Sequence, residues 1–195
     1  MKKHFYDYLW VASALYLILG FFNILFAWLG LLCFMIPLLI SVFGKSKAYC
    51  NRYCGRGQLF SLLGQTLRLS RNKPMPRFLK SRIFRYGFLV FFMTMFGLMI
   101  AQTVGIFLNA DSLKTAVTLL WTFRVPWTFA YTETALPAWV SQFAFGFYSI
   151  MLTSTILGIV LMVLYKPRAW CVCCPMGTMT QLVCKAHAHG KTDQN

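Results

Sequence analysis

The longest apolar run restricts the fold of this chain more than any other feature. Residues 5–44 include a single charged side chain, that of Asp7. As one helix, this run would be about twice as long as the hydrocarbon core of a bilayer, which is roughly 30 Å thick. We therefore expect the run to fold back near residues 20–30 into two membrane-spanning helices. The apolar stretches 87–108 and 139–165 are each long enough to span once more, so the sequence predicts four transmembrane helices.

The composition agrees with a protein that lies in a lipid bilayer. Hydrophobic residues make up 58% of the chain and charged residues 12%, whereas about 25% of the residues of a soluble domain are charged. The formal net charge is +15, which in a soluble protein would indicate binding to nucleic acid. Here the membrane topology accounts for the positions of the charges. We therefore expect the lipid bilayer as a partner and no nucleic acid.

Lysine and arginine residues orient the predicted helices. The loop between the second and third spans carries Lys45, Lys47, Arg52, Arg56, Arg68, Arg71, Lys73, Arg77, Lys80, Arg82 and Arg85. Residues 109–138, between the third and fourth spans, carry only Lys114 and Arg124, and the segment after the fourth span is basic again. Basic loops stay on the cytoplasmic side of a membrane. We therefore expect both termini and the long basic loop in the cytoplasm, in a multi-pass protein of the cytoplasmic (inner) membrane.

Two pairs of cysteines stand just beyond the second and fourth predicted spans. The pairs are Cys50 with Cys54 and Cys171 with Cys174. A structural disulfide is disfavoured because the cytoplasm keeps thiols reduced, whereas four thiolates are the usual ligand set of one iron–sulfur cluster. We therefore expect all four cysteines to bind one cluster at the cytoplasmic face. Cys173 is an alternative ligand in the second pair.

The two cysteine pairs indicate an internal duplication. Residues 1–86 and 87–195 each contain two predicted spans, a cysteine motif and a short helical segment, which in the first half is an interfacial helix near 58–69. Each half enters and leaves the membrane on the cytoplasmic side, so the repeats are parallel and related by an axis along the membrane normal. The predicted fold is an all-α membrane protein with four transmembrane helices in two parallel helix-pair repeats, N-in and C-in. The axis would bring the two motifs face to face.

The residues around the motifs suit a cluster site. A glycine stands three positions after the second cysteine of each motif, at Gly57 and Gly177, and permits a close approach of the backbone. Arg56, like Arg52, would offset the negative charge of a thiolate-bound cluster. We expect Cys33 and Cys184 to be packing residues.

Two other functions are compatible with these cysteines. A set of four cysteines can also bind zinc, which would make the protein a zinc-clamped membrane assembly factor. Without a metal, the two cysteine pairs could exchange thiols and disulfides, which would make the protein a thiol–disulfide carrier. Zinc ribbons form soluble knuckles, whereas these motifs adjoin membrane spans, so we favour the iron–sulfur interpretation.

At the cysteine motifs, the chain resembles the membrane-bound iron–sulfur proteins of the NapH/NosR-type polyferredoxin group. In that group, Cys-x-x-x-Cys-Pro motifs follow transmembrane helices at the cytoplasmic face. Pro175 stands at the position of the family's proline, whereas Gly55 replaces the proline of the first motif and the second motif is one residue short. The ferredoxin-type modules of many members are absent from this sequence, so the resemblance is to a minimal form.

The resemblance implies a [4Fe–4S] cluster in preference to a [2Fe–2S] cluster. It also implies an electron-transfer subunit, a non-catalytic component of an oxidoreductase complex. Such a subunit would relay electrons between a ferredoxin-like cytoplasmic protein and a quinone, or an extracytoplasmic flavin or haem protein. One cluster at the cytoplasmic face cannot reach across the bilayer, so a further redox centre near the outer face is expected.

Overall fold

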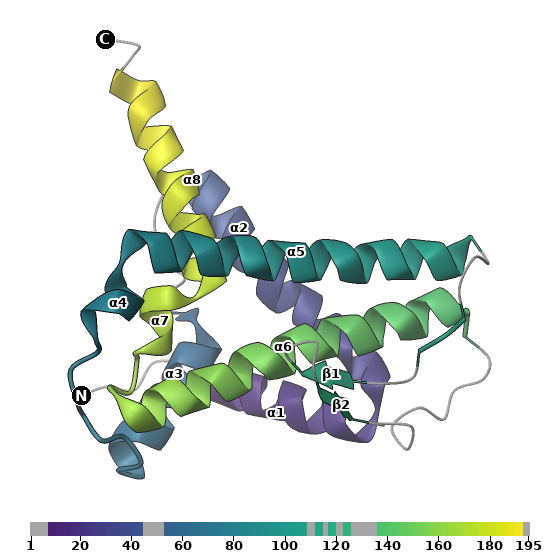
Figure 1. The fold of residues 1–195 in the computed structure, drawn as a ribbon, viewed down its shortest axis with the longest axis horizontal. Coiled ribbons are helices and arrows are strands. Elements are labelled where there is room, and N and C mark those ends of the chain that lie inside the picture. Colours follow the sequence, from purple (N-terminus) through teal and green to yellow (C-terminus); the bar gives the residue numbers. More distant parts are fainter. Residues whose placement is uncertain are drawn as a thin grey trace. The chain divides into compact units, whose positions relative to one another are not determined.

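The computed structural model describes residues 8–44, 53–108, 112–114, 117–119, 123–125 and 136–192. These residues form helices and one pair of short strands (Figure 1). In chain order the elements are α1 (Leu9–Phe22), the 3₁₀-helix η2 (Ile24–Trp28), α2 (Leu29–Gly44), α3 (Gly55–Ser61), the π-helical turn η4 (Leu62–Thr66), α4 (Arg77–Lys80), α5 (Arg82–Phe107), β1 (Val117–Leu119), β2 (Phe123–Val125), α6 (Ala138–Leu164), α7 (Trp170–Cys173) and α8 (Pro175–Thr192). The chain is predominantly helical, as the sequence predicts.

Three helical segments in the described part of the chain are long and apolar enough to cross a membrane. They are Ile24–Gly44, Arg82–Phe107 and Ala138–Leu164, with 21, 26 and 27 residues. Each exceeds the roughly 20 residues that a bilayer core requires. The remaining predicted span corresponds to α1, whose 14 residues fall short of that length. The structure therefore supports a membrane protein with three candidate spans.

The first long apolar run folds back at Asn23. This residue has an extended backbone (φ −141°, ψ 118°), and its side-chain oxygen accepts a hydrogen bond from the Leu25 N–H at 3.0 Å. Such a side-chain cap ends one helix and starts the next. Beyond the turn, a Cβ on Gly30 would lie 2.8 Å from the Tyr16 ring, so the two helices are in close contact. The reversal falls within the predicted range of residues 20–30.

The chain forms two compact units, and both predicted halves contribute to each. The first unit comprises Met1–Ser13, Cys33–Val90 and Gly158–Asn195, and the second comprises Ala14–Leu32 and Phe91–Leu157. The predicted repeats, 1–86 and 87–195, are defined by sequence and not by these contacts. They stay a prediction.

The second unit is built around α6. Tyr148 is buried and donates a hydrogen bond from its hydroxyl to the Leu17 carbonyl at 3.0 Å, while Trp28 packs on Phe143 with ring centroids 4.5 Å apart. The antiparallel strands β1 and β2 pair Val117 with Val125. These strands are not predicted from the sequence. Their β-branched and aromatic residues favour extended backbone.

Candidate functional site

The second cysteine of each motif stands directly before a helix. Cys54 has a non-helical backbone (φ −71°, ψ 99°) and caps α3, whereas Cys174 (φ −57°, ψ 126°) precedes α8. Pro175 explains the second case, because a proline disfavours helical backbone in the residue before it and is well tolerated at the first position of a helix. The two motifs therefore share a local arrangement although their spacings differ.

Gly57 is the point at which the two cysteine motifs meet. A Cβ on Gly57 would lie 3.6 Å from Cys54 Sγ and 3.6 Å from Cys171 Sγ. The two sulfurs are therefore separated by no more than twice this distance. The Gly57 N–H also donates a hydrogen bond to Cys54 Sγ at 3.4 Å, which stabilises negative charge on that sulfur. The structure thus brings together one predicted ligand from each half of the sequence.

Gly177 occupies the corresponding place in the second motif. A Cβ there would lie 3.6 Å from the Cys171 carbonyl oxygen and 3.9 Å from Cys174 Cβ. Thr178 donates hydrogen bonds to the Cys174 carbonyl from its N–H at 3.0 Å and from its hydroxyl at 3.2 Å. These contacts hold the backbone of the second motif against the start of α8. Cys174 itself is half-buried.

Cys50 lies outside the described residues, as does Arg52. Among the residues that the structure describes, no group of three or more histidine, cysteine or carboxylate side chains is arranged to hold a metal ion. The structure therefore places Cys54 close to Cys171. Cys174 lies three residues after Cys171 in the same short segment. The assignment of Cys50 rests on its place in the first motif.

Cys173 differs from Cys171 and Cys174 in its burial. It is 2% exposed and donates a hydrogen bond from Sγ to the Trp170 carbonyl at 3.6 Å. Burial raises the pKa of the Cys173 thiol, and this effect exceeds the opposing effects of a backbone hydrogen bond and of the positive charge of Arg85. Burial therefore disfavours the thiolate form that a cluster ligand takes. Cys171, by contrast, is exposed.

The other two described cysteines, Cys33 and Cys184, lie on helices α2 and α8 and outside the two motifs in sequence. Cys184 Sγ is 3.7 Å from the Ser41 hydroxyl, which in turn donates a hydrogen bond to the Thr180 carbonyl at 3.2 Å. This contact joins α2 to α8. Cys33 lies on an exposed face of the helix α2. The contact of Cys184 agrees with the packing role expected of it. Cys33 lies within electrostatic range of Cys54 and Arg56, and its packing role stays a prediction.

A tightly packed aromatic cluster lies next to the cysteine motifs. A Cβ on Gly158 would collide with the Phe60 ring and approach Trp170 Cγ to 3.3 Å. Phe60 is completely buried, and Trp170 meets Phe88 edge-on with ring centroids 5.7 Å apart. Gly158 and Phe60 are not among the site residues predicted from the sequence. A small residue within a membrane helix is the signal that could have indicated this contact.

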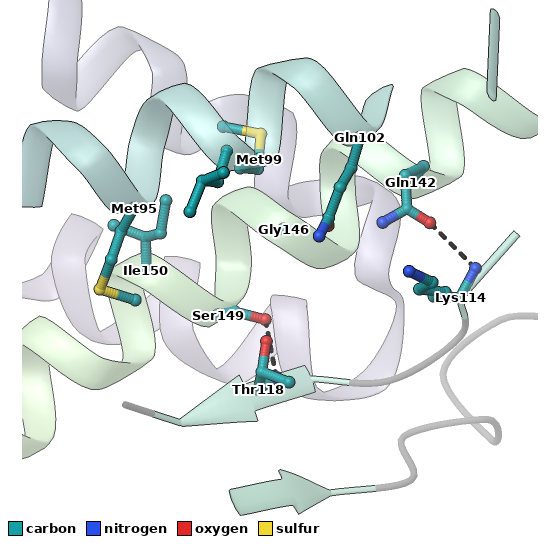
Figure 2. Close-up of a pocket in the computed structure, with 10 residues that line it drawn as sticks. Met95, Met99, Gln102, Lys114, Thr118, Gln142, Gly146, Ser149 and Ile150 are labelled. Atoms are coloured by element: carbon teal, nitrogen blue, oxygen red, sulfur yellow. Dashed lines mark hydrogen bonds between the residues drawn. The ribbon is translucent and has the colours of Figure 1, made fainter. Parts of the chain in front are cut away.

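The second unit contains a cavity of about 230 Å³ (Figure 2). Its lining combines thioether and aliphatic side chains with amide, hydroxyl and amino groups, and consists of Met95, Leu98, Met99, Gln102, Lys114, Thr118, Gln142, Gly146, Ser149 and Ile150. Gln142 accepts a hydrogen bond from the Lys114 N–H at 3.0 Å through its side-chain oxygen. Ser149 accepts one from the Thr118 N–H, also at 3.0 Å. Such a mixture of apolar walls and a few fixed polar groups is typical of a small-molecule site.

Comparison with known families supports a cluster at the cysteine motifs. The sequence model of a 4Fe-4S binding domain matches residues 26–76 and 149–191, which include all four predicted ligands. No curated protein and no solved structure matches the chain. The family match supports an iron–sulfur protein with a [4Fe–4S] cluster. The described residues fit such a cluster. The sulfurs of Cys54 and Cys171 both face the space left by the missing side chain of Gly57, and Cys54 Sγ accepts a hydrogen bond from the Gly57 N–H.

Proposed function

We propose that this protein is a membrane electron-transfer subunit that carries one [4Fe–4S] cluster at the cytoplasmic face of the inner membrane. The proposed ligands are Cys50, Cys54, Cys171 and Cys174. The observation that carries the proposal is the meeting of Cys54 and Cys171 at Gly57, within the two regions that match a 4Fe-4S binding domain. A [4Fe–4S] cluster, when bound, accepts and donates single electrons.

The residues around the ligands have distinct parts in this function. The Gly57 N–H compensates charge on Cys54 Sγ through a hydrogen bond, and hydrogen bonds to ligand sulfurs influence the reduction potential of a cluster. Trp170 and Phe60 are buried beside the motif and exclude water from that side. Low exposure to solvent is a second influence on the potential. Cys173 serves packing in this proposal, because its buried thiol is bonded to the backbone.

The proposed topology has four spans in two parallel repeats, with both cysteine motifs in the cytoplasm. Three candidate spans and the distribution of lysine and arginine support it. In this topology, α1 is the fourth crossing segment, although it is shorter than the others. Local thinning of the bilayer can accommodate a short span at a modest free-energy cost.

The proposed redox partners lie on the two sides of the membrane. A ferredoxin-like protein would exchange electrons with the cluster in the cytoplasm, and a quinone or an extracytoplasmic flavin or haem protein would do so toward the outer face. The cavity in the second unit supports a quinone, because its wall is largely apolar and carries side-chain amides that can donate hydrogen bonds to carbonyl oxygens. Gln102 and Gln142 supply these amides from α5 and α6, as Figure 2 shows.

Anaerobic purification tests the proposal directly. The protein should be brown, contain iron and acid-labile sulfide, and give an EPR signal of a reduced [4Fe–4S] cluster. A colourless protein that takes up no cluster on reconstitution with iron and sulfide would contradict the proposal. Stoichiometric zinc in the native protein would instead favour the zinc-clamped assembly factor. Redox-dependent labelling of the cysteines without any metal would favour the thiol–disulfide carrier.

A further inference from the structure

Arg85 is a cation held in a fixed position within the first unit. It is half-buried near the start of α5, and its Nη2 donates a hydrogen bond to the Gln181 side-chain oxygen of α8 at 2.7 Å. Its Nε is buried and has no hydrogen-bond partner among the residues that the structure describes. A buried donor without an acceptor is destabilising. Such a group in a native fold calls for a specific explanation.

Both helices that hold Arg85 border the second cysteine motif. On α5, Arg85 lies one turn before Phe88, which packs edge-on against Trp170, the residue before Cys171. On α8, Gln181 lies one turn after Gly177, whose Cβ position is 3.6 Å from the Cys171 carbonyl. The guanidinium is therefore anchored beside the segment that carries Cys171.

The backbone at Arg85 is also tied to the cysteine-bearing segment. The Arg85 N–H donates a hydrogen bond to the Ser81 carbonyl at 3.2 Å. Ser81 directly follows α4, which packs against the cysteine-bearing helix α7. A half-buried charge is screened by salt much less than a charge on the surface.

The chain offers very few carboxylates to balance this cation. The sequence has 19 lysine and arginine residues and only 4 aspartate and glutamate residues. These four are Asp7, Asp111, Glu133 and Asp193, and all lie outside the described residues. No carboxylate therefore faces Arg85 in the part of the chain that the structure describes. An anionic group beside Arg85 would offset the free-energy cost of its half-buried charge.

We propose that Arg85 is the fixed cation that balances the negative charge of the thiolate-bound cluster and raises its reduction potential. The inference rests on the proposed function, since it requires a cluster at the cysteine motifs. Reduction adds a negative charge to the cluster, and a nearby positive charge favours that step. Gln181 serves to hold the guanidinium in place.

The test is a redox titration of the cluster, followed by EPR, in the wild-type protein and three variants. Arg85→Gln removes the charge, and Arg85→Lys retains it on a different side chain. Arg82→Gln is the matched control, because Arg82 lies one turn earlier on α5 and is exposed. We expect Arg85→Gln to weaken reduction about tenfold, which equals about 59 mV for a one-electron couple. Arg85→Lys should show less than half of this shift, and Arg82→Gln should match the wild type.

Each result distinguishes the role of Arg85 from the presence of the cluster. If Arg85→Gln lost the cluster and Arg85→Lys retained it, this would also support a role for the positive charge at this position. An unchanged potential in Arg85→Gln would refute the proposed role of Arg85, and this result is also expected if an anionic lipid headgroup is the partner of Arg85. The role would also be refuted if Arg82→Gln shifted the potential as much as Arg85→Gln does. An equal shift in Arg85→Lys, or loss of its cluster, would refute it as well. A wild-type protein that cannot be loaded with a cluster would refute the proposed function itself, and this inference with it.

Discussion

Cys54 Sγ and Cys171 Sγ each lie 3.6 Å from the point that a Cβ on Gly57 would occupy. The two cysteines belong to opposite halves of the sequence, and each follows a different long apolar helix. Their approach therefore depends on the packing of α3 against the segment that contains α7. A side chain on Gly57 would occupy the space that both sulfurs face.

Substitution of a ligand should remove the cluster. We expect Cys171→Ser to reduce iron and acid-labile sulfide to background, because a serine hydroxyl is a poor replacement for a thiolate on iron. Cys173→Ser should retain most of the iron, since Cys173 is buried and bonded to the Trp170 carbonyl. Metal analysis and visible absorption of the anaerobically purified variants measure both. Equal losses in the two variants would contradict the assignment of Cys171.

A larger side chain at Gly57 should exclude the cluster. We expect Gly57→Leu to lower the iron content to well under half of the wild-type value, because the added atoms project toward both sulfurs. Gly87→Leu is the matched control, since no atom outside its own stretch of helix lies within 4 Å of the position of its Cβ. Iron content per folded protein, after reconstitution, gives the comparison. If Gly57→Leu binds as much iron as Gly87→Leu, the cluster does not occupy this space.

Gly158 should be sensitive even to a single added methyl group. A Cβ at this position collides with the Phe60 ring, which is completely buried and cannot move aside easily. Overpacking of this kind typically destabilises a protein by about 1–3 kcal/mol. For a chain of this size we expect the melting temperature in detergent to fall by about 2–4 °C for each kcal/mol. Gly97→Ala should have little effect, because Gly97 has no neighbour within 4 Å of its Cβ position. Equal melting temperatures of the two variants would argue against this packing.

The orientation in the membrane can be tested by adding one cysteine on either side. We expect a membrane-impermeant maleimide to label Ser112→Cys in intact cells and to leave Lys73→Cys unlabelled. Both positions are exposed. Lysis of the cells should make Lys73→Cys reactive as well. Labelling of Lys73→Cys before lysis would contradict the proposed topology, in which the basic loop lies in the cytoplasm.

The cavity of the second unit should influence the reaction with quinones. We expect Gln102→Leu to slow the oxidation of the reduced protein by a short-chain quinone severalfold, because it removes an amide from the cavity wall. Cluster content and the reduction potential should stay unchanged, which separates this effect from damage to the cluster. Stopped-flow absorption measures the rate. Leu98→Val, another change in the cavity wall, keeps the amides and serves as the control. If Gln102→Leu reacts at the wild-type rate, the cavity is not the quinone site.

Some parts of the site were predictable because they depend on local sequence. The paired cysteines, the glycine three positions after each pair and Pro175 are visible without a structure, and together they predict a thiolate site. The turn at Asn23 could be placed within residues 20–30, because the apolar run is too long for one crossing. The strands β1 and β2 escaped prediction, since three residues each provide too little pattern to recognise.

The sequence by itself determined the helical membrane character and the type of chemistry, because both follow from composition and from the spacing of a few residues. Only the tertiary structure decided which residues meet. It placed Cys171 beside Cys54 and buried Cys173, two positions farther along the chain. It also gave Arg85, one of many basic residues, a fixed partner in Gln181. These outcomes depend on how α3, α5 and α8 pack around the short helix α7, and contacts between segments so distant in sequence leave no local pattern to read.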